Sequence, residues 1–559
     1  MTHRLTLGSV LAALLACTIA APLKGLDRQT VQDEYDFIIA GGGPTGPVLA
    51  NRLTKSGKNQ VLLKSSWHTS HRADINSLAA PPFTGASLDD RILRYYRGNC
   101  LGGSSAINGF YYGRGTSMVY DDWVTRGNPG WGWDDIYPLF DPSAYSDGPL
   151  KIGFQGYVPP SGVGFIEASA EALRVPIVED YNTGNSTGVK QGTAQVDGKF
   201  ERSSSYDGYL KEALGRPNLD VLHDAPVWKI NFDTTGDRPR ATGVAFTDHP
   251  TGIVHDVYAK KEVIVSAGAF DLPQLLMGSG VGPKDQLEKY GIDIVHINEN
   301  IGQHLNDHSV FSIMALSTPE FSSSDMAATY ADLRAAQLEF YSNLTGQYTA
   351  PSCITNAFQR LSAEELREIG AEAIIDAGLE NQSHIEYPYE RVFYPNGPTP
   401  YYTPKGNETY ISLTASSMVA LSRGNVTLQS NSVAELFAIN RNGTNRPQYY
   451  ADPTDAKIAT ASFKYLRKIL AHPRMAQYTM GPNDGENTVP NWHASGTNQM
   501  LLEADGGVVD PSLKVSGVDG LRVCDCSIIP VLPRVNIVAT VFMIGEKGAQ
   551  LIRRDWGDL

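Results

Sequence analysis

The stretch "YDFIIAGGGPTGPVLANRL" at residues 35–53 decides the fold of this chain. An apolar run typical of a buried strand leads into glycines, and a segment typical of a helix follows. Gly41, Gly43 and Gly46 form the pattern G-x-G-x-x-G at the turn. Without a Cβ atom, the backbone there can approach a pyrophosphate that lies at the helix N-terminus. The stretch therefore predicts a dinucleotide-binding unit, and the alternative is a tight glycine turn that holds no ligand.

The next strand, within "VLLKSSW" at 61–67, lacks the acidic residue that is expected roughly 20 residues after such a turn. Lys64, Ser65 and Ser66 stand where Asp or Glu normally holds a ribose hydroxyl. Losing one charged hydrogen bond costs about 1.5–3 kcal/mol, which is about tenfold to a hundredfold in affinity. We therefore expect a dinucleotide to be held less firmly, with Ser65 able to make one hydrogen bond.

The composition is that of an ordinary folded protein with more than one core. The chain has 559 residues, of which 42% are hydrophobic and 19% charged. Its formal net charge of -14 repels phosphate, so we expect no nucleic-acid partner and no binding to anionic lipid.

The first 21 residues place one Arg before an apolar stretch that ends in small residues, which indicates a secretory signal peptide. A membrane anchor is the alternative, but the stretch is short for a span. We expect secretion, or delivery to a vesicle or vacuole lumen, with N-glycosylation and no membrane span. The Asn-x-Ser/Thr sites are Asn185, Asn343, Asn381, Asn407, Asn425 and Asn442.

Pattern changes divide the remainder into three parts. Residues 33–310 read as an α/β unit with substrate-side insertions, and 311–485 alternate strand-like and helical pieces as an α+β unit does. Residues 486–559 return to a hydrophobic strand and a long helix. We expect this last part to rejoin the first unit.

Seven motifs in order, from residue 35 to the end, resemble the glucose–methanol–choline (GMC) oxidoreductase family. After the opening stretch come "GNCLGGSSAINGFYYGRG", "DDWVTRGNPGWGWDDIYPLF", "EVIVSAGAFDLPQLLMGSGVGP", "NIGQHLNDH", "NWHASGTNQM" and "GLRVCDCSIIPVLPRVNIVATVFMIGEKGAQLI". The sequence is most similar to secreted fungal members such as aryl-alcohol oxidases and enzymes resembling patulin synthase and versicolorin B synthase.

The resemblance implies FAD as the cofactor and a Rossmann-like α/β FAD-binding domain. It also implies an α+β substrate-binding domain on a largely antiparallel sheet. The residues expected to bind FAD are Gly41, Gly43, Pro44, Thr45, Gly46, Ser65, Asn108, Gly109, Phe110, Tyr111, Val227, Trp492, Asp525, Cys526, Ile537 and Val538.

The same resemblance implies that His493 and Asn536 are the catalytic pair. Oxidising an alcohol requires its hydroxyl proton to leave while a hydride moves from the same carbon to flavin N5. An imidazole that titrates near neutrality suits the role of base, and an amide can orient the hydroxyl. The alternatives are a core histidine at 493 and a helix N-cap at Asn536.

We expect no metal site. His304 and His308 in "GQHLNDH" have a spacing that suggests one, but we interpret them as a polar turn near the cofactor. The "CDC" at 524–526 has too few companions for zinc and is interpreted as strand-end packing.

The expected activity is FAD-dependent oxidation of a small aromatic or polyketide-derived alcohol, with oxygen or a quinone-like compound as electron acceptor. Two alternatives stay open: a non-redox cyclase with structural FAD, and a secreted glycoprotein without flavin. The stretch from 65 to Gly102 is shorter than the family's usual run, which fits either a faulty gene model or a diverged paralogue.

Overall fold

The structure is a computed structural model of the whole chain. It describes residues 31–65, 79–84, 92–140, 148–248, 253–322, 330–350, 353–394, 408–431, 448–480 and 485–558. The predicted signal peptide at 1–21 lies outside these residues, as do Ser66 and the sequons at Asn407 and Asn442.

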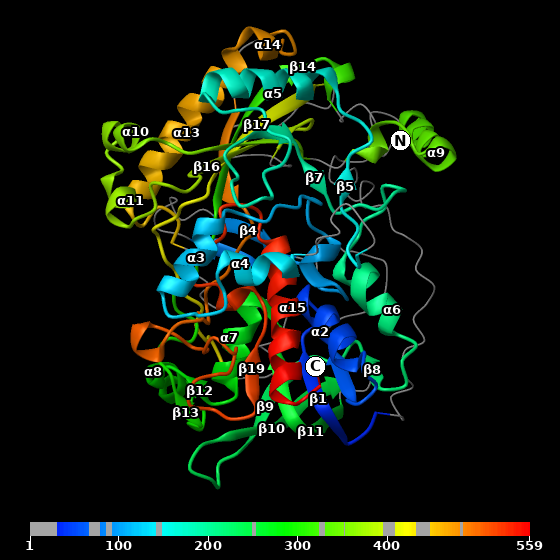
Figure 1. Cartoon of the computed structure of the whole chain (residues 1–559), viewed down its shortest axis with the longest axis vertical. Helices are drawn as coiled ribbons and strands as arrows, with labels where there is room; N and C mark the ends of the chain where they lie inside the picture. Colours follow the sequence, from blue (N-terminus) through cyan, green and yellow to red (C-terminus); the bar gives the residue numbers. More distant parts are fainter. Residues whose placement is uncertain are drawn as a thin grey trace, which may run out of the picture.

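A mixed sheet of seven strands forms the lower half of the molecule in Figure 1. Its order is β8 (Leu219–Leu222), β2 (Val61–Lys64), β1 (Glu34–Ala40), β11 (Ile253–Val265), β10 (Arg240–Asp248) and β9 (Val227–Asp233), with β19 (Leu521–Val523) also on β11. The pairs among β8, β2, β1, β11 and β19 are parallel, and β10 pairs antiparallel with β11 and β9. This is the predicted Rossmann-like α/β unit. Strand β11 belongs to both patterns, because its first half pairs with β10 and its second half with β1.

A second sheet, fully antiparallel, lies in the upper half of Figure 1. Its order is β18 (Gly485–Pro490), β14 (Ser309–Ser317), β17 (Thr409–Ser417), β16 (Ile385–Glu390), β15 (Cys353–Gln359) and β6 (Gly188–Gln191). The predicted antiparallel substrate-side sheet is confirmed. The exact division of the chain into 33–310, 311–485 and 486–559 stays a prediction.

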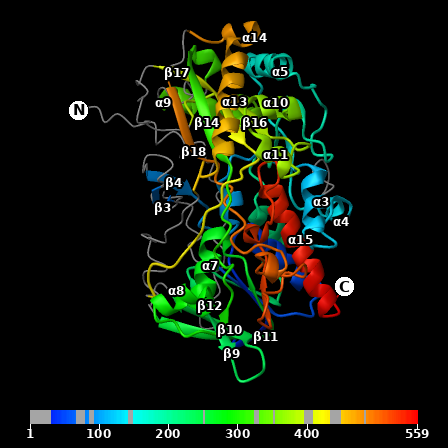
Figure 2. The same ribbon diagram turned by 90° about the vertical axis from the view of Figure 1, so that its left-hand side faces the viewer.

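Alternation along these strands separates the two faces of the second sheet. Phe311, Ile313 and Leu413 belong to a core with residues of α5 (Pro160–Leu173) and α13 (Pro453–Ala471), which cover the outer face. Figure 2 shows α13 alongside these strands. Because side chains alternate across a strand, the opposite face presents a different set, which includes Ser312, Thr414 and Glu386 as well as the apolar Met314.

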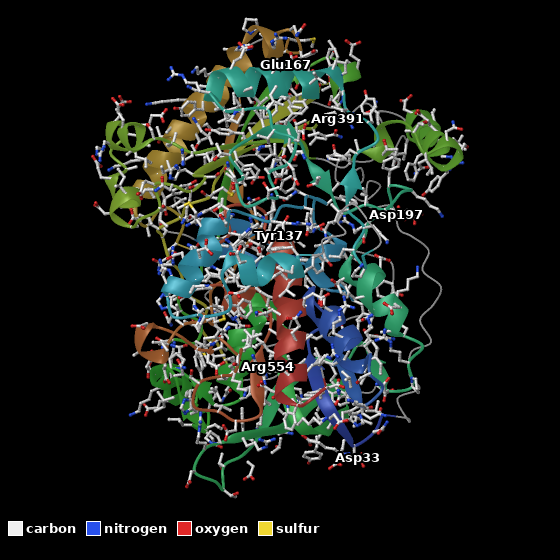
Figure 3. The ribbon with its side chains drawn as sticks, in the orientation of Figure 1. Asp33, Tyr137, Glu167, Asp197, Arg391 and Arg554 are labelled. Carbon is white, nitrogen blue, oxygen red and sulfur yellow. The ribbon has the colours of Figure 1, made fainter. Side chains whose placement is uncertain are left out.

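The remaining regular elements are short or peripheral. The other helices are α3 (Ser117–Thr125), α4 (Trp133–Ile136), α6 (Lys211–Ala213), α7 (Gly268–Gly278), α8 (Lys284–Lys289), α9 (Tyr330–Asn343), α10 (Ala363–Glu368), α11 (Glu372–Asp376) and α14 (Pro473–Ala476). The two-stranded sheets pair β3 (Ala79–Thr84) with β4 (Ile92–Tyr96), β5 (Gly153–Phe154) with β7 (Thr193–Ala194), and β12 (Val281–Gly282) with β13 (His296–Ile297). Figure 3 shows Glu167 of α5 at one end of the molecule and Asp33, just before β1, at the other.

The last helix of the chain lies against the first unit. Helix α15 (Val538–Asp555) packs against α2 (Thr45–Thr54), and a Cβ added to Gly545 would lie 3.1 Å from Val48. Small residues at this contact let the two helices approach closely.

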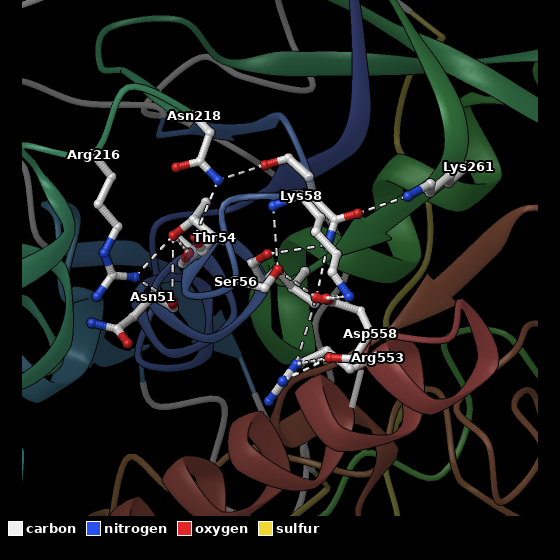
Figure 4. A network of polar contacts seen from close by, with 12 residues as sticks. Asn51, Thr54, Ser56, Lys58, Arg216, Asn218, Lys261, Arg553 and Asp558 are labelled. Atoms are coloured by element: carbon white, nitrogen blue, oxygen red, sulfur yellow. Dashed lines mark hydrogen bonds and ion pairs between the residues drawn. The ribbon is translucent and has the colours of Figure 1, made fainter.

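A polar network fixes the far end of α15 (Figure 4). Asp558 accepts a hydrogen bond from Asn59 at 3.1 Å, and the Arg553 guanidinium donates to the Asp558 carbonyl at 3.0 and 2.7 Å. Asn218, just before β8, donates to the carbonyls of Thr54 and Asn59. Asp558 is thus anchored to the dinucleotide unit through Asn59.

Candidate active site

The glycine turn after β1 is shaped by two glycines and left open at a third. Gly41 has φ 130°, and a Cβ there would lie 2.2 Å from the Ser266 carbonyl oxygen. A Cβ on Gly46 would lie 2.1 Å from the Gly41 oxygen. A Cβ on Gly43, in contrast, would meet nothing closer than that Ser266 oxygen at 3.4 Å. Packing therefore demands the outer two glycines, whereas Gly43 faces space that a ligand can enter.

The helix after the turn is ready to receive an anion. Pro44 is the N-cap of α2, no side chain caps the first turn, and the first turn holds no acid. The Thr45 hydroxyl points elsewhere, because it donates to the Cys524 carbonyl at 2.7 Å. The uncapped amides and the space beside Gly43 fit the pyrophosphate of FAD.

Ser65, and not Lys64, faces the glycine turn at the end of β2. A Cβ added to Gly42 would lie 2.9 Å from the Ser65 hydroxyl oxygen. Lys64 projects to the other face of the sheet, where its side-chain nitrogen lies over the Phe246 ring of β10. Among the described residues nothing accepts a hydrogen bond from Lys64 Nζ, and burial lowers the pKa of Lys64 to about 5. Lys64 is thus a neutral core residue and no substitute for the missing acid.

Asp525, which follows β19, bonds the backbone at the start of α7. Its carboxylate accepts from the Gly268 amide at 2.7 Å and from the Ser527 amide at 2.8 Å, and burial raises its pKa. Cys526 follows at the start of a short helical turn, and burial raises the pKa of its thiol to about 12. Val227 is the first residue of β9 and pairs with Phe246. The predicted contacts of these residues with FAD remain predictions.

The loop of Asn108, Gly109, Phe110 and Tyr111 is held by partners that the sequence did not suggest. Asn108 Oδ1 accepts from Arg202 at 2.6 Å, and Asn108 Nδ2 donates to Gln195 at 2.8 Å. The Arg202 guanidinium also lies 3.6 Å from the centre of the Phe110 ring. Phe110 has φ 68°, so this stack and the side chain of Asn108 maintain an unfavourable backbone conformation.

His493 lies in the interior between the two sheets and is 8% exposed. Its backbone amide donates to Asp307 at 2.8 Å. Burial lowers the pKa of His493 to about 4, and a hydrogen bond with the Asn536 side chain acts in the opposite direction. The expectation of an imidazole that titrates near neutrality is therefore wrong in this structure, because desolvation disfavours the charged ring. His493 is neutral at ordinary pH and can accept a proton.

Asn536 joins His493 to the second sheet. Its Nδ2 donates to Glu386 of β16 at 3.0 Å, and Asn356 of β15 donates to the same carboxyl oxygen at 2.5 Å. The N-cap of α15 is Ile537, so Asn536 is not the N-cap that the alternative interpretation required. Burial raises the pKa of Glu386 to about 8, so this carboxyl is mostly protonated at neutral pH.

His308 lies on the other side of His493. The two Nδ1 atoms are 3.0 Å apart, and both rings are buried. His304 is half-buried beside Gly506 and has φ 61°. The described residues contain no group of His, Cys, Asp or Glu that could hold a metal ion. His308 contacts His493 directly and so belongs to the site, which the interpretation as a polar turn did not include.

Asp307 organises the same corner. Besides the His493 amide it accepts a hydrogen bond from the Tyr449 hydroxyl, and Tyr95 accepts from the Ala494 amide at 2.6 Å while also bonding Asp307. Burial raises the pKa of Asp307 to about 7. Trp492 has φ 55°, and this network holds the strained turn that carries His493.

Sequence reasoning named His493 and Asn536 but not His308, Asp307 or Glu386 as their neighbours. Asp307 and His308 stand in the quoted motif "NIGQHLNDH", so that motif was the available signal. Glu386 carries no motif, and only its place on a strand face of the second sheet marks it.

No helix among the described residues is long and apolar enough to cross a membrane.

Known proteins match the chain along most of its length. The family model described as GMC oxidoreductase matches residues 35–310 in its N-terminal part and 420–545 in its C-terminal part.

Dehydrogenase pkfF of Emericella nidulans is 29% identical and aligns over 93% of either chain. Patulin synthase of Aspergillus clavatus is 27% identical over 92% of this chain and 91% of its own. The solved structure of a fungal aryl-alcohol oxidase superposes with a TM-score of 0.79 and 23% identity, over 94% of this chain and 100% of that one. The chain therefore belongs to the GMC oxidoreductase family, and it is an FAD-dependent oxidoreductase that acts on alcohol groups.

Proposed function

We propose that this enzyme oxidises a small aromatic or polyketide-derived alcohol, with His493 as the base that takes the hydroxyl proton. The observation that carries this proposal is the buried, neutral His493, whose pKa the neighbouring Asn536 side chain raises against the effect of burial. The Asn536 amide is itself fixed by Glu386. FAD, when bound, supplies the acceptor for the hydride that leaves the alcohol carbon.

The chain's own residues account for the proton. A neutral imidazole at ordinary pH has one ring nitrogen that can accept, and Nδ1 of His493 already faces His308. Nε2 is left to take the proton of the alcohol, while Asn536 can hold the alcohol oxygen by a hydrogen bond. Loss of this proton and of one hydride converts the alcohol to an aldehyde or ketone.

Aromatic side chains beside the catalytic pair support an aromatic or flat polyketide substrate. Tyr111, Tyr181 and Phe358 form a cluster with Val535, the residue directly before Asn536. The Tyr111 and Tyr181 hydroxyls bond each other at 2.7 Å, so the polar groups of this buried cluster are already paired. Aromatic side chains this close to Asn536 suit an aromatic substrate, because aromatic rings pack well against one another. The similarity to patulin synthase of Aspergillus clavatus is consistent with a polyketide-derived alcohol.

The electron acceptor in this proposal is oxygen or a quinone-like compound. Secretion, or delivery to a vesicle or vacuole lumen, with N-glycosylation belongs to the same proposal. Asn185, Asn343 and Asn381 are exposed and so accessible to a glycosyltransferase, while Asn425 is half-buried. A glycosidase-sensitive shift in mass of the secreted protein tests this part.

The test of the activity is the visible spectrum of the purified protein under anaerobic conditions with a panel of aryl alcohols. We expect flavin bands that at least one alcohol bleaches, and a His493→Ala variant that keeps its flavin but is not bleached. Flavin that no alcohol reduces would favour a non-redox cyclase with structural FAD. A colourless protein would favour a glycoprotein that has lost the cofactor.

A further inference from the structure

His308 and His493 meet through the same type of ring nitrogen. Their Nδ1 atoms are 3.0 Å apart, and the rings are nearly perpendicular, at 86°. His308 is fully buried just before β14, and burial together with the nearby His493 and Arg534 lowers its pKa well below the usual range. Both rings are therefore neutral, and a single proton occupies the hydrogen bond between them.

Only one placement of that proton suits a base. If His308 held it, Nδ1 of His493 would accept and Nε2 of His493 would carry the other proton, unable to take one from an alcohol. If His493 holds it, Nε2 is bare and His308 is the acceptor. His308 then carries its own proton on Nε2.

The surroundings of His308 permit this placement. Nε2 of His308 has no partner that meets hydrogen-bond geometry within the described part of the chain. The Met418 carbonyl nevertheless lies close enough to favour a proton on that side of the ring. This carbonyl also accepts from Arg534 at 2.9 Å.

We propose that His308 is a positioning residue, which accepts the Nδ1 proton of His493 and so leaves Nε2 as the proton acceptor. This inference rests on the proposed role of His493 as the base. Once His493 has taken the alcohol's proton, its Nδ1–H bond to His308 becomes a bond from a charged donor and strengthens. His308 therefore stabilises the protonated ring at the moment when the ring forms.

Other ionisable groups surround the pair and influence any pH dependence. The groups that face His493 or His308 from neighbouring elements are Asp307, Tyr95, Tyr449, Arg534 and, through Asn536, Glu386. The variants below leave all of these in place.

The first test needs no substrate: the ring ¹⁵N spectrum of the histidine-labelled holoenzyme at neutral pH, with the His493 signals assigned by their loss in His493→Ala. We expect His493 to be protonated on Nδ1 and bare on Nε2. A proton on Nε2 in the wild-type holoenzyme would overturn the proposal, whether or not any alcohol is oxidised.

The second test is kinetic and uses an aryl alcohol that bleaches the wild-type flavin, beginning with 4-methoxybenzyl alcohol. In His308→Leu the Nδ1 proton of His493 has no acceptor, so kcat should fall about 10- to 100-fold with KM and flavin content nearly unchanged. His308→Asn offers an amide oxygen and should recover part of the loss. His304→Asn is the matched control in the same turn and should keep wild-type kcat.

The acid limb of kcat/KM separates positioning from mere packing. Removing an acceptor of the Nδ1 proton disfavours the protonated ring, so the limb should stay at the wild-type pH or move lower in His308→Leu. If the variant instead opens the site to water, the limb moves up toward the ordinary histidine range, and the proposal fails. Wild-type kcat in His308→Leu would also overturn it. If His308→Leu does not fold, the ring ¹⁵N spectrum of His308→Asn is the deciding measurement. The proposal holds if Nδ1 of His493 is still protonated in that variant and fails if it is not.

Discussion

Replacing Lys64 with Met should stabilise the protein by an amount that depends on pH. Lys64 is 1% exposed, without a hydrogen-bond acceptor, and burial lowers its pKa from 10.5 to about 5. The unfolded chain therefore binds a proton that the folded chain lacks between those two values. Stability falls as pH drops through this window and levels off below about 5.

The magnitude follows from the gap between the working pH and the unfolded pKa. At pH 7 the gap is about 3.5 units, and at about 1.4 kcal/mol per unit the cost is about 5 kcal/mol. Met fills a similar volume without a charge, so Lys64→Met should gain about this free energy of unfolding at pH 7. The gain should shrink by about 1.4 kcal/mol for each unit that the pH is raised.

The assay is equilibrium urea unfolding followed by tryptophan fluorescence at several values from pH 6 to pH 9, with saturating FAD throughout. The exposed Lys55, at the end of α2, provides the matched control Lys55→Met, whose difference from wild type should be small and flat. The pKa values of Glu386 and Glu390 are raised from 4.5 to about 8, so these two residues make the free energy of unfolding fall as pH rises through that range. They are present in all three proteins and cancel in the differences. A Lys64→Met difference that is flat with pH, or a less stable variant, would refute the assignment of a neutral buried lysine.

Three further changes test the site itself. Glu386→Leu should release the Asn536 amide and lower the rate of flavin reduction, measured by stopped flow, about 10- to 100-fold. Glu386→Gln keeps an acceptor oxygen, so its rate should stay within several-fold of wild type. Equal rates in both variants would contradict a positioning role for Glu386. Gly43→Ala should have the circular dichroism spectrum of the folded protein but a lower ratio of flavin to protein absorbance. Gly41→Ala should instead lower the unfolding midpoint, because its Cβ would clash with the Ser266 oxygen. Full flavin content in Gly43→Ala would place the pyrophosphate elsewhere. Ser65→Glu restores an acid beside the glycine turn and should tighten FAD binding by about 10- to 100-fold in fluorescence titration of the apoprotein, and an unchanged dissociation constant would remove residue 65 from the ribose site.

The sequence predicted those features that are encoded within single motifs. The strand, turn and helix at 35–53 form as expected, because their pattern needs only local geometry. The second sheet and the family were predicted correctly from spaced motifs. The partners of the catalytic pair were not, because His308 and His493 are 185 residues apart and Glu386 and Asn536 are 150 apart. No local pattern encodes such a contact.

The lowered pKa of His493 and the burial of the Lys64 side chain were also not predicted. The pKa of His493 is lowered to about 4 because the ring is buried between two sheets, and burial is a property of the assembled fold. Likewise, the alternation of β2 sends Lys64 to one face and Ser65 to the other, but only the position of β10 shows that the lysine is enclosed.

The most direct test is an experimental structure of the holoenzyme at a resolution that places the flavin ring. We expect the isoalloxazine ring against the imidazole of His493 and the backbone of residues 108–111, with the pyrophosphate at Gly43. Flavin bound with His493 turned away from its ring, or a site filled by protein atoms so that no flavin enters, would contradict the assignment of His493 as the base.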